Sequence, residues 1–188
     1  MKTGLIIAIV IAALVVLIAI YVTSTYNSLI KGKNTVEEAF STMDVYLKKR
    51  WDLIPNIVAS VKGYAKHEAE TLEKVISARN AGYASMTTEQ KLEANAELTR
   101  GLASFNAVAE QYPDLKANQN FMDLNAQLKR TEEDIANARK YYNAVVKNFN
   151  NKVQMFPSSI VAGMFHFEKQ QMFVVDDSAE RQAVKVEF

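Results

Sequence analysis

Few residues in this chain have the types and spacing that catalysis or metal binding requires. His67 and Glu68 begin like the zinc-binding H-E-x-x-H motif, in which a second histidine lies one turn later on the same helical face. Thr71 stands at that position, so two-histidine zinc binding fails. The chain has no cysteine, which excludes thiolate catalysis and cysteine-bound metals. We therefore predict no catalytic residue, no metal ligand and no cofactor.

An enzyme would need a site assembled from neighbouring polar side chains. The candidates are Tyr64, Lys66, His67 and Glu68. The second histidine, His166, belongs to an aromatic C-terminal segment far along the chain. The sequence has neither a G-x-S-x-G nucleophile elbow nor a glycine-rich phosphate loop. We predict a non-enzymatic protein without a small-molecule substrate.

The composition favours a helical protein without a nucleic-acid partner. The 188 residues include 22 basic and 21 acidic side chains, and the formal net charge of +1 gives no field that would recruit nucleic acid. Apolar residues make up 49%, which is enough for a core. Six glycines and three prolines are few for this length, and this scarcity favours long helices over a β fold with many turns.

The beginning of the chain predicts a membrane anchor. Residues 4–22 carry no charge, and as a helix they rise about 28 Å, close to the hydrocarbon thickness of a bilayer. The alternative is a cleaved signal peptide, whose apolar core is usually about 7–15 residues long. Ala8, Ala12 and Ala19 share one helical face, on which two such helices could approach each other. We expect a retained single-pass helix in the lipid bilayer and a homo-oligomer.

The charges beside this run indicate an orientation. Lys31 and Lys33 follow it, whereas Lys2 alone precedes it. The positive-inside rule then places the short N-terminus outside and the body of the protein in the cytoplasm.

Apolar residues in the body recur with the period of a helix. The first stripe consists of Leu29, Val36, Phe40, Met43, Leu47, Trp51 and Ile54, and similar stripes follow over 58–76, 98–112 and 121–153. Pro55 interrupts the first stripe, because it cannot donate a backbone hydrogen bond and disfavours helix at the preceding residue. The pattern leaves two alternatives, namely four helices with a corner at Pro55 or three with the first one kinked there.

Local chemistry marks the helix boundaries. Thr87 and Gln90 form a capping box, and Asp114 can cap a last long helix from about 115 to about 154. Beyond it, Pro157 breaks the helix, and Gln171–Asp177 and Ala183–Phe188 could be extended.

Together these elements predict an all-α protein in three parts. We expect a transmembrane anchor over 1–24, an elongated antiparallel helical bundle over 25–155 and a short, partly extended aromatic tail over 156–188 that packs on the bundle. Lys48, Lys49 and Arg50 form a basic run, which we interpret as a solvated helix face, with anionic lipid head groups as the alternative partner.

The sequence resembles the LemA family over nearly its whole length. The resemblance is carried by Tyr26–Ile30, Val36–Phe40, Asp44–Arg50, the DLIPNIV run of Asp52–Val58, the VKGYAKHE run of Val61–Glu68 and the closing FPSSIVAGMFHFEKQQMFVVDD. Phe40 and Ser159 depart from the tryptophan and asparagine that are usual there. The resemblance implies a bacterial membrane protein with an outside N-terminus, a cytoplasmic helical bundle and no established enzymatic activity.

Two functions follow as hypotheses. The first is an interaction scaffold that binds other membrane proteins, such as the membrane-bound zinc proteases with which family members are associated. The second is a self-assembling protein that organises or shapes the membrane. Candidate interaction or structural residues are Pro55, Gly63, Tyr64, His67, Glu68, Phe156, Pro157, Phe165 and Phe167, and candidate contacts within the membrane span are Ala8, Ala12 and Ala19.

Overall fold

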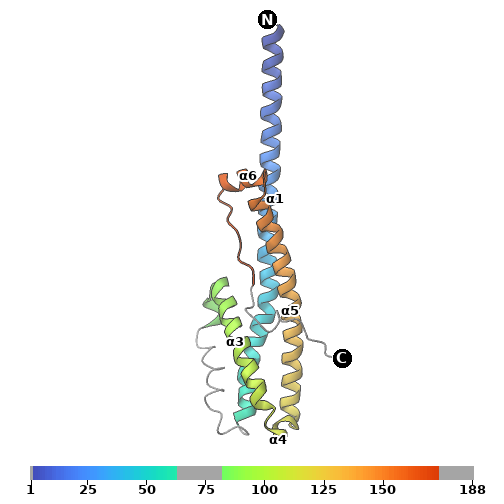
Figure 1. Cartoon of the computed structure of the whole chain (residues 1–188), viewed down its shortest axis with the longest axis vertical. Helices are drawn as coiled ribbons and strands as arrows, with labels where there is room; N and C mark the ends of the chain where they lie inside the picture. Colours follow the sequence, from blue (N-terminus) through green and yellow to red (C-terminus); the bar gives the residue numbers. More distant parts are fainter. Residues whose placement is uncertain (1, 63–81, 174–188) are drawn as a thin grey trace, which may run out of the picture. The chain divides into compact units, whose positions relative to one another are not determined.

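The computed structural model describes residues 2–62 and 82–173, and of residues 2, 62 and 103–108 it describes the backbone only. Within these ranges the chain is all-α and contains no strand (Figure 1). The elements are α1 (Lys2–Lys62), the 3₁₀ turn η1 (Tyr83–Ser85), α3 (Thr88–Ala109), α4 (Pro113–Lys116), α5 (Gln119–Gln154) and α6 (Ser158–Met164). The predicted fold class is therefore confirmed.

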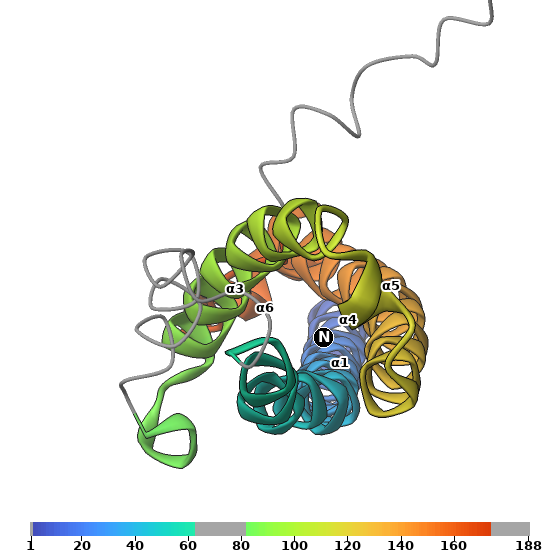
Figure 2. The same cartoon turned by 90° about the horizontal axis from the view of Figure 1, so that it is seen from below.

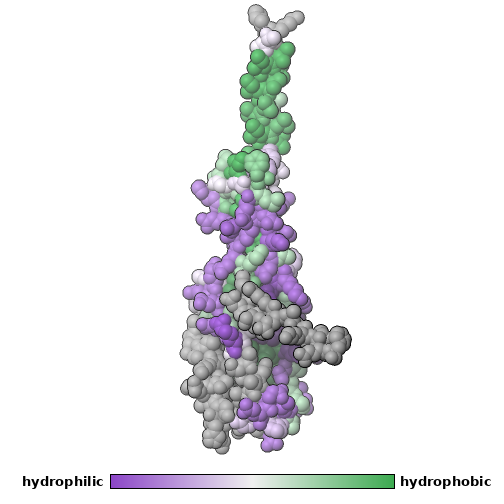
Figure 3. Space-filling model, viewed as in Figure 1, coloured by the Kyte–Doolittle hydropathy of each residue, from purple (hydrophilic) through white to green (hydrophobic). Residues whose placement is uncertain are grey.

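Helix α1 has 61 residues and contains the apolar run. This run is long and apolar enough to cross a membrane, and none of it is buried. Figure 3 shows a continuous hydrophobic surface on the visible face of the N-terminal part of this helix. The same helix then supplies the core residues Leu29, Met43 and Leu47, each fully buried. One uninterrupted helix thus carries both the predicted anchor and the first part of the bundle.

Pro55 lies inside α1, which continues to Lys62. The alternative in which a helix ends at a corner at Pro55 is therefore wrong. An interior proline removes one backbone hydrogen bond and costs about 3 kcal/mol or more. Trp51, Ile54 and Val58 around it are buried. Because each buried large apolar side chain contributes about 1.5–3 kcal/mol, packing offsets the lost bond and keeps the helix whole.

The chain divides into two compact units, which α1 and α5 both enter. The first unit, which we call the anchor unit, comprises residues 1–42 and 138–172. In it α1 and α5 are antiparallel, since Lys152 contacts Ser28 while Tyr142 contacts Phe40. Helix α6 follows α5, and the segment after α6 returns beside α5 without regular structure (Figure 1).

The second unit, the distal unit, comprises residues 43–137 and 173–188. Its core is formed by the C-terminal part of α1, by α3 and by the first half of α5, and Figure 2 views these helices end-on, with α4 joining α3 to α5. The largest fully buried apolar side chains here are Met43, Leu47, Ile54, Ile57, Val61, Leu98 and Leu115. The apolar stripe predicted beyond Val61 lies in 63–81, outside the described residues.

Of the two helix caps predicted from the sequence, one agrees with the structure and one differs. The capping box is confirmed, because the Gln90 amide donates to Thr87 Oγ1 at 3.3 Å and the Thr87 amide donates to Gln90 Oε1 at 2.8 Å. The predicted Asp114 cap is wrong. Asp114 lies in the short helix α4, and Asn118 Oδ1 accepts from the amide of Phe121 at the start of α5. The single helix expected over 115–154 is consequently two helices.

Candidate functional site

A buried arginine joins three helices of the distal unit. Arg50 of α1 is 2% exposed. Its Nη1 donates to Thr99 Oγ1 of α3 at 3.0 Å and to both carboxylate oxygens of Glu132 of α5 at 3.0 and 3.1 Å. Its Nη2 donates to the carbonyl and the side-chain oxygen of Asn95 at 2.9 and 2.8 Å. The planar guanidinium can satisfy several acceptors at once, which suits it to such a junction.

The interpretation of the basic run as a solvated face is wrong for Arg50. Lys48 and Lys49 are exposed, but Arg50 points into the core. Its place in the apolar stripe is the signal that could have revealed this, because it follows Leu47 by three residues and precedes Ile54 by four. Charged residues are rarely buried unless they are paired, so burial also required Asn95 and Glu132 far along the chain.

A second polar cluster ties α3 and η1 to α1. Asp44 accepts from the Tyr83 hydroxyl at 2.6 Å and from Lys91 Nζ at 2.6 Å. The ring of Tyr83 packs against Trp51, with centroids 5.2 Å apart, and Lys91 Nζ lies 5.0 Å from the same ring. Burial, with the hydrogen bond to the Asp44 carboxylate as the next cause, raises the pKa of the Tyr83 hydroxyl.

These two clusters hold helices of the distal unit together. Among the described residues no group of three or more His, Cys, Asp or Glu side chains is placed to hold a metal ion. A buried arginine bound to Thr99, Asn95 and Glu132 instead fixes how α1, α3 and α5 meet.

The candidate residues predicted from the sequence come from several different parts of the chain. Pro55 is half-buried within α1, and Ala8, Ala12 and Ala19 are exposed along the apolar run. Gly63, Tyr64, His67 and Glu68 lie outside the described residues.

The four candidate residues of the tail, Phe156, Pro157, Phe165 and Phe167, lie in the anchor unit. The ring of Tyr26 on α1 packs against Phe165, with centroids 4.7 Å apart, and against Phe167, at 5.8 Å. Phe156 and Pro157, which connect α5 to α6, are exposed instead. The structure thus brings two of the four predicted aromatic-tail residues together on one tyrosine.

Side chains of α5 hold the segment after α6 in place. The amide of Asn150 pairs with the backbone of Gln170 in both directions, with one bond of 2.9 Å and one of 2.8 Å. The Tyr142 hydroxyl donates to the carbonyl of Gln171 at 2.8 Å. These bonds satisfy backbone groups of a segment that has no secondary structure of its own.

Helices α1 and α5 approach closely in the anchor unit at Gly32. A side-chain carbon placed at Gly32 would lie 3.0 Å from the ring of Phe149, which is buried. Gly32 was not among the residues predicted from the sequence to be functional. Its signal is a glycine within a helical apolar stripe, between Leu29 and Val36, where glycine otherwise lowers helix stability.

Large apolar side chains are exposed around α6. We define the α6 patch as Met155, Phe156, Ile160, Met164 and Phe165, all of which are exposed. Val161 and Ala162 of the same helix are buried instead. Helix α6 therefore has two apolar faces, of which one is covered and one is not.

Comparison with known proteins decides the family. The model of the LemA family matches residues 39–188. The chain belongs to the LemA family. The matched region of this LemA family member includes Arg50, all of α3, α4 and α6, and both partners of the Asn150 pairing.

A curated relative carries the same family name. The chain is 28% identical over 139 residues to "Protein LemA" of Metamycoplasma hominis, and the alignment covers 72% of this chain. It spans 63% of the length of that relative.

Proposed function

We propose that this LemA family member is a single-pass, membrane-anchored helical module that binds other membrane proteins and catalyses no reaction itself. The observation that carries the proposal is α1, because one helix contains an exposed apolar run and continues into a packed bundle. Exposing such a run to water is unfavourable by about 25 cal/mol for each Å² of apolar surface. A bilayer removes this penalty and holds the bundle at the membrane.

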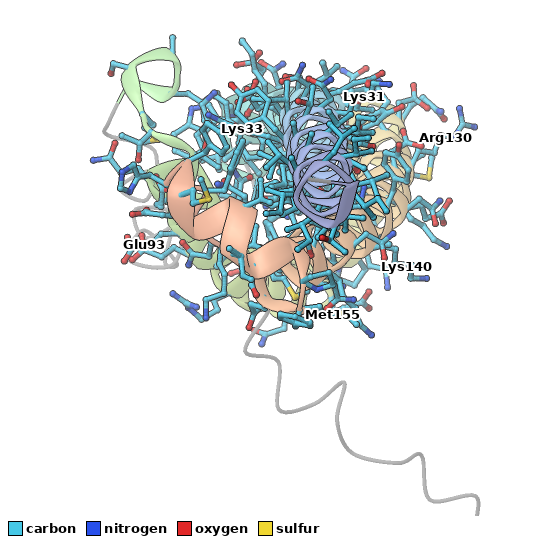
Figure 4. All side chains as sticks on the ribbon, turned by 90° about the horizontal axis from the view of Figure 1, so that it is seen from above. Lys31, Lys33, Glu93, Arg130, Lys140 and Met155 are labelled. Carbon is cyan, nitrogen blue, oxygen red and sulfur yellow. The ribbon has the colours of Figure 1, made fainter. Side chains whose placement is uncertain are left out.

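Charge supports a cytoplasmic bundle and a short N-terminus outside. Beyond the apolar run, residues 23–42 and 138–172 of the anchor unit carry seven basic and three acidic side chains, a formal net charge of +4. Lys31 and Lys33 come within 15 residues of the run, the distance over which the positive-inside rule acts. Figure 4 shows the side chains seen from the N-terminal end of α1, with Lys31 and Lys140 among those at the periphery.

The distal unit has the opposite charge. It carries 14 basic and 18 acidic side chains, a formal net charge of −4. Glu89, Glu93 and Glu97 follow one another at four-residue spacing along α3 and are exposed. Cytoplasmic loops of membrane proteins are rich in lysine and arginine. The chemistry of α3 therefore fits a basic loop of a multi-pass membrane protein, and a membrane protease is one partner of that class.

A crosslinking experiment in native membranes tests this proposal. A photo-reactive residue at position 96 of α3 is expected to capture a membrane protein, and the doubly substituted Glu93→Lys, Glu97→Lys variant is expected to lose that product. Asp123→Lys with Glu133→Lys is the matched control, because it makes the same charge change at exposed positions of α5. Equal loss in both variants would show that α3 is not the binding surface.

Self-assembly within the membrane is the second candidate. The observation that favours it is the exposed small-residue face formed by Ala8, Ala12 and Ala19, which would allow two anchors to pack closely. Measuring the mass of the full-length protein in lipid nanodiscs tests it. A uniform oligomer that dissociates when Ala12 is changed to Leu supports lateral assembly, whereas a clean monomer contradicts it.

A further inference from the structure

Exposed apolar side chains outside the apolar run are concentrated in one short segment. Among the residues whose side chains are described, the large exposed apolar ones beyond Tyr21 are Val45, Met122, Tyr141 and the five members of the α6 patch. Phe156 is 80% exposed, and Met155 and Met164 are each 61% exposed. Such a cluster in one segment indicates a surface that meets an apolar environment.

This patch lies at the end of the apolar run, within the same unit. Phe165 packs on Tyr26, which is only one helical turn, about 6 Å, beyond Val22 at the end of the run. The Lys152 ammonium donates to Ser28 Oγ at 2.9 Å, so the end of α5 lies at the same level of α1. Figure 3 shows the hydrophobic surface of α6 directly below that of the run.

These distances match the dimensions of a bilayer. The apolar run as a helix spans about 28 Å, nearly the full hydrocarbon thickness of about 30 Å. The polar interface on each side is about 5–8 Å deep. A segment one turn beyond the run therefore lies at the level of the lipid head groups, where amphipathic helices and aromatic side chains are stable.

The charges of the anchor unit complement an anionic lipid surface. Outside the apolar run, the anchor unit contains seven basic side chains and only three acidic ones. Lys31, Lys33 and Lys152 are exposed and come from the parts of α1 and α5 nearest to the patch. Basic side chains close to an anionic leaflet add attraction to the burial of apolar surface.

We propose that the α6 patch is a second membrane contact, in which Met155, Phe156, Ile160, Met164 and Phe165 enter the head-group interface of the bilayer that α1 crosses. The anchor unit is then attached to the membrane at two points, which are α1 and the α6 patch beside it. Continuity with the apolar run selects lipid over a partner protein as the occupant. This inference rests on the proposed anchoring of α1.

The absence of cysteine makes the proposal directly testable, because a single introduced cysteine can be labelled without first replacing native cysteines. We would attach an environment-sensitive fluorophore to Met164→Cys in the full-length protein and reconstitute it in nanodiscs of phosphatidylethanolamine and phosphatidylglycerol. Lys140→Cys is the matched control, since it is exposed on α5 of the same unit and lies about 21 Å along the helix from Gln154. Leu14→Cys reports on the anchor itself.

The expected result is strong quenching of the Met164 label by lipids that carry a nitroxide near the head group, with no quenching of the Lys140 label. Equal solvent exposure of both labels would overturn the inference. A Met164 label that is protected from aqueous quenchers but not quenched by lipid would also overturn it, in favour of a protein occupant such as a second copy. If the Leu14 label is not quenched by lipid nitroxides in the acyl chains, the anchoring of α1 fails instead.

Discussion

The guanidinium of Arg50 lies 3.0 Å from the carboxylate of Glu132, which stands 82 residues later in the chain. Arg50 is buried while the Glu132 side chain is 39% exposed, so the pair lies at the edge of the core of the distal unit. One charge is withdrawn from water and the other remains partly hydrated. The arrangement lowers the desolvation penalty that a fully buried pair would have.

Replacing Arg50 is expected to destabilise the distal unit strongly. The Arg50→Ala variant leaves the side-chain oxygen of the buried Asn95 without its Arg50 donor, and an unsatisfied buried group costs about 1–3 kcal/mol. Lys49→Ala is the matched control, because Lys49 is exposed on the same helix. Thermal unfolding followed by circular dichroism in nanodiscs should show a large decrease in melting temperature for Arg50→Ala and almost none for Lys49→Ala. Equal melting curves would mean that the junction contributes nothing.

Alkaline pH is expected to destabilise the fold through Tyr83. Its pKa is raised in the folded protein, so the unfolded chain releases this proton first as the pH rises. The stabilisation is fully present below the ordinary tyrosine pKa of about 10 and falls as the pH rises above it. Unfolding measured between pH 8 and pH 11 should show a shallower loss of stability above pH 10 for Tyr83→Phe than for the wild type. If stability falls with pH as steeply in Tyr83→Phe as in the wild type, Tyr83 is not the group responsible.

Replacing Gly32 and Gly163 by alanine is expected to change the stability of the fold in opposite directions. Alanine is favoured over glycine in a helix by about 1 kcal/mol, and nothing lies within 4 Å of the added carbon at Gly163, so Gly163→Ala should stabilise. At Gly32 the added carbon meets the buried Phe149 ring at 3.0 Å. Overpacking of this kind costs about 1–3 kcal/mol, so Gly32→Ala should destabilise. Chemical unfolding of both variants measures these two changes in stability. A more stable Gly32→Ala variant would show that the Phe149 ring can move to make room.

Asn150 is expected to hold the segment that follows α6. Asn150→Ala removes two hydrogen bonds to the backbone of Gln170, at a net cost of about 0.5–1.5 kcal/mol each. Hydrogen exchange at the Gln170 amide should accelerate in this variant and stay unchanged in Asn148→Ala, which alters an exposed residue two positions earlier. Unchanged exchange in Asn150→Ala would show that other contacts hold the segment.

The sequence by itself determined the features that depend on neighbouring residues. Periodic apolar stripes predicted long helices, because residues three and four apart share a helical face. The Thr87–Gln90 capping box formed as expected, since both of its bonds join residues three apart. The uncharged run of 4–22 likewise indicated a helix long enough to cross a membrane from its length and composition alone.

Only the tertiary structure decided the features that depend on residues far apart. Arg50 follows two exposed lysines, and its burial rests on acceptors 45 and 82 residues later in the chain. Pro55 satisfied the local rules for a helix end, yet the helix continues there because Trp51, Ile54 and Val58 are buried in the core. In the stripe predicted over 121–153, Val145 is half-buried, whereas its neighbour Val146 is buried. Local chemistry sets which conformations are possible, and packing between distant segments selects among them.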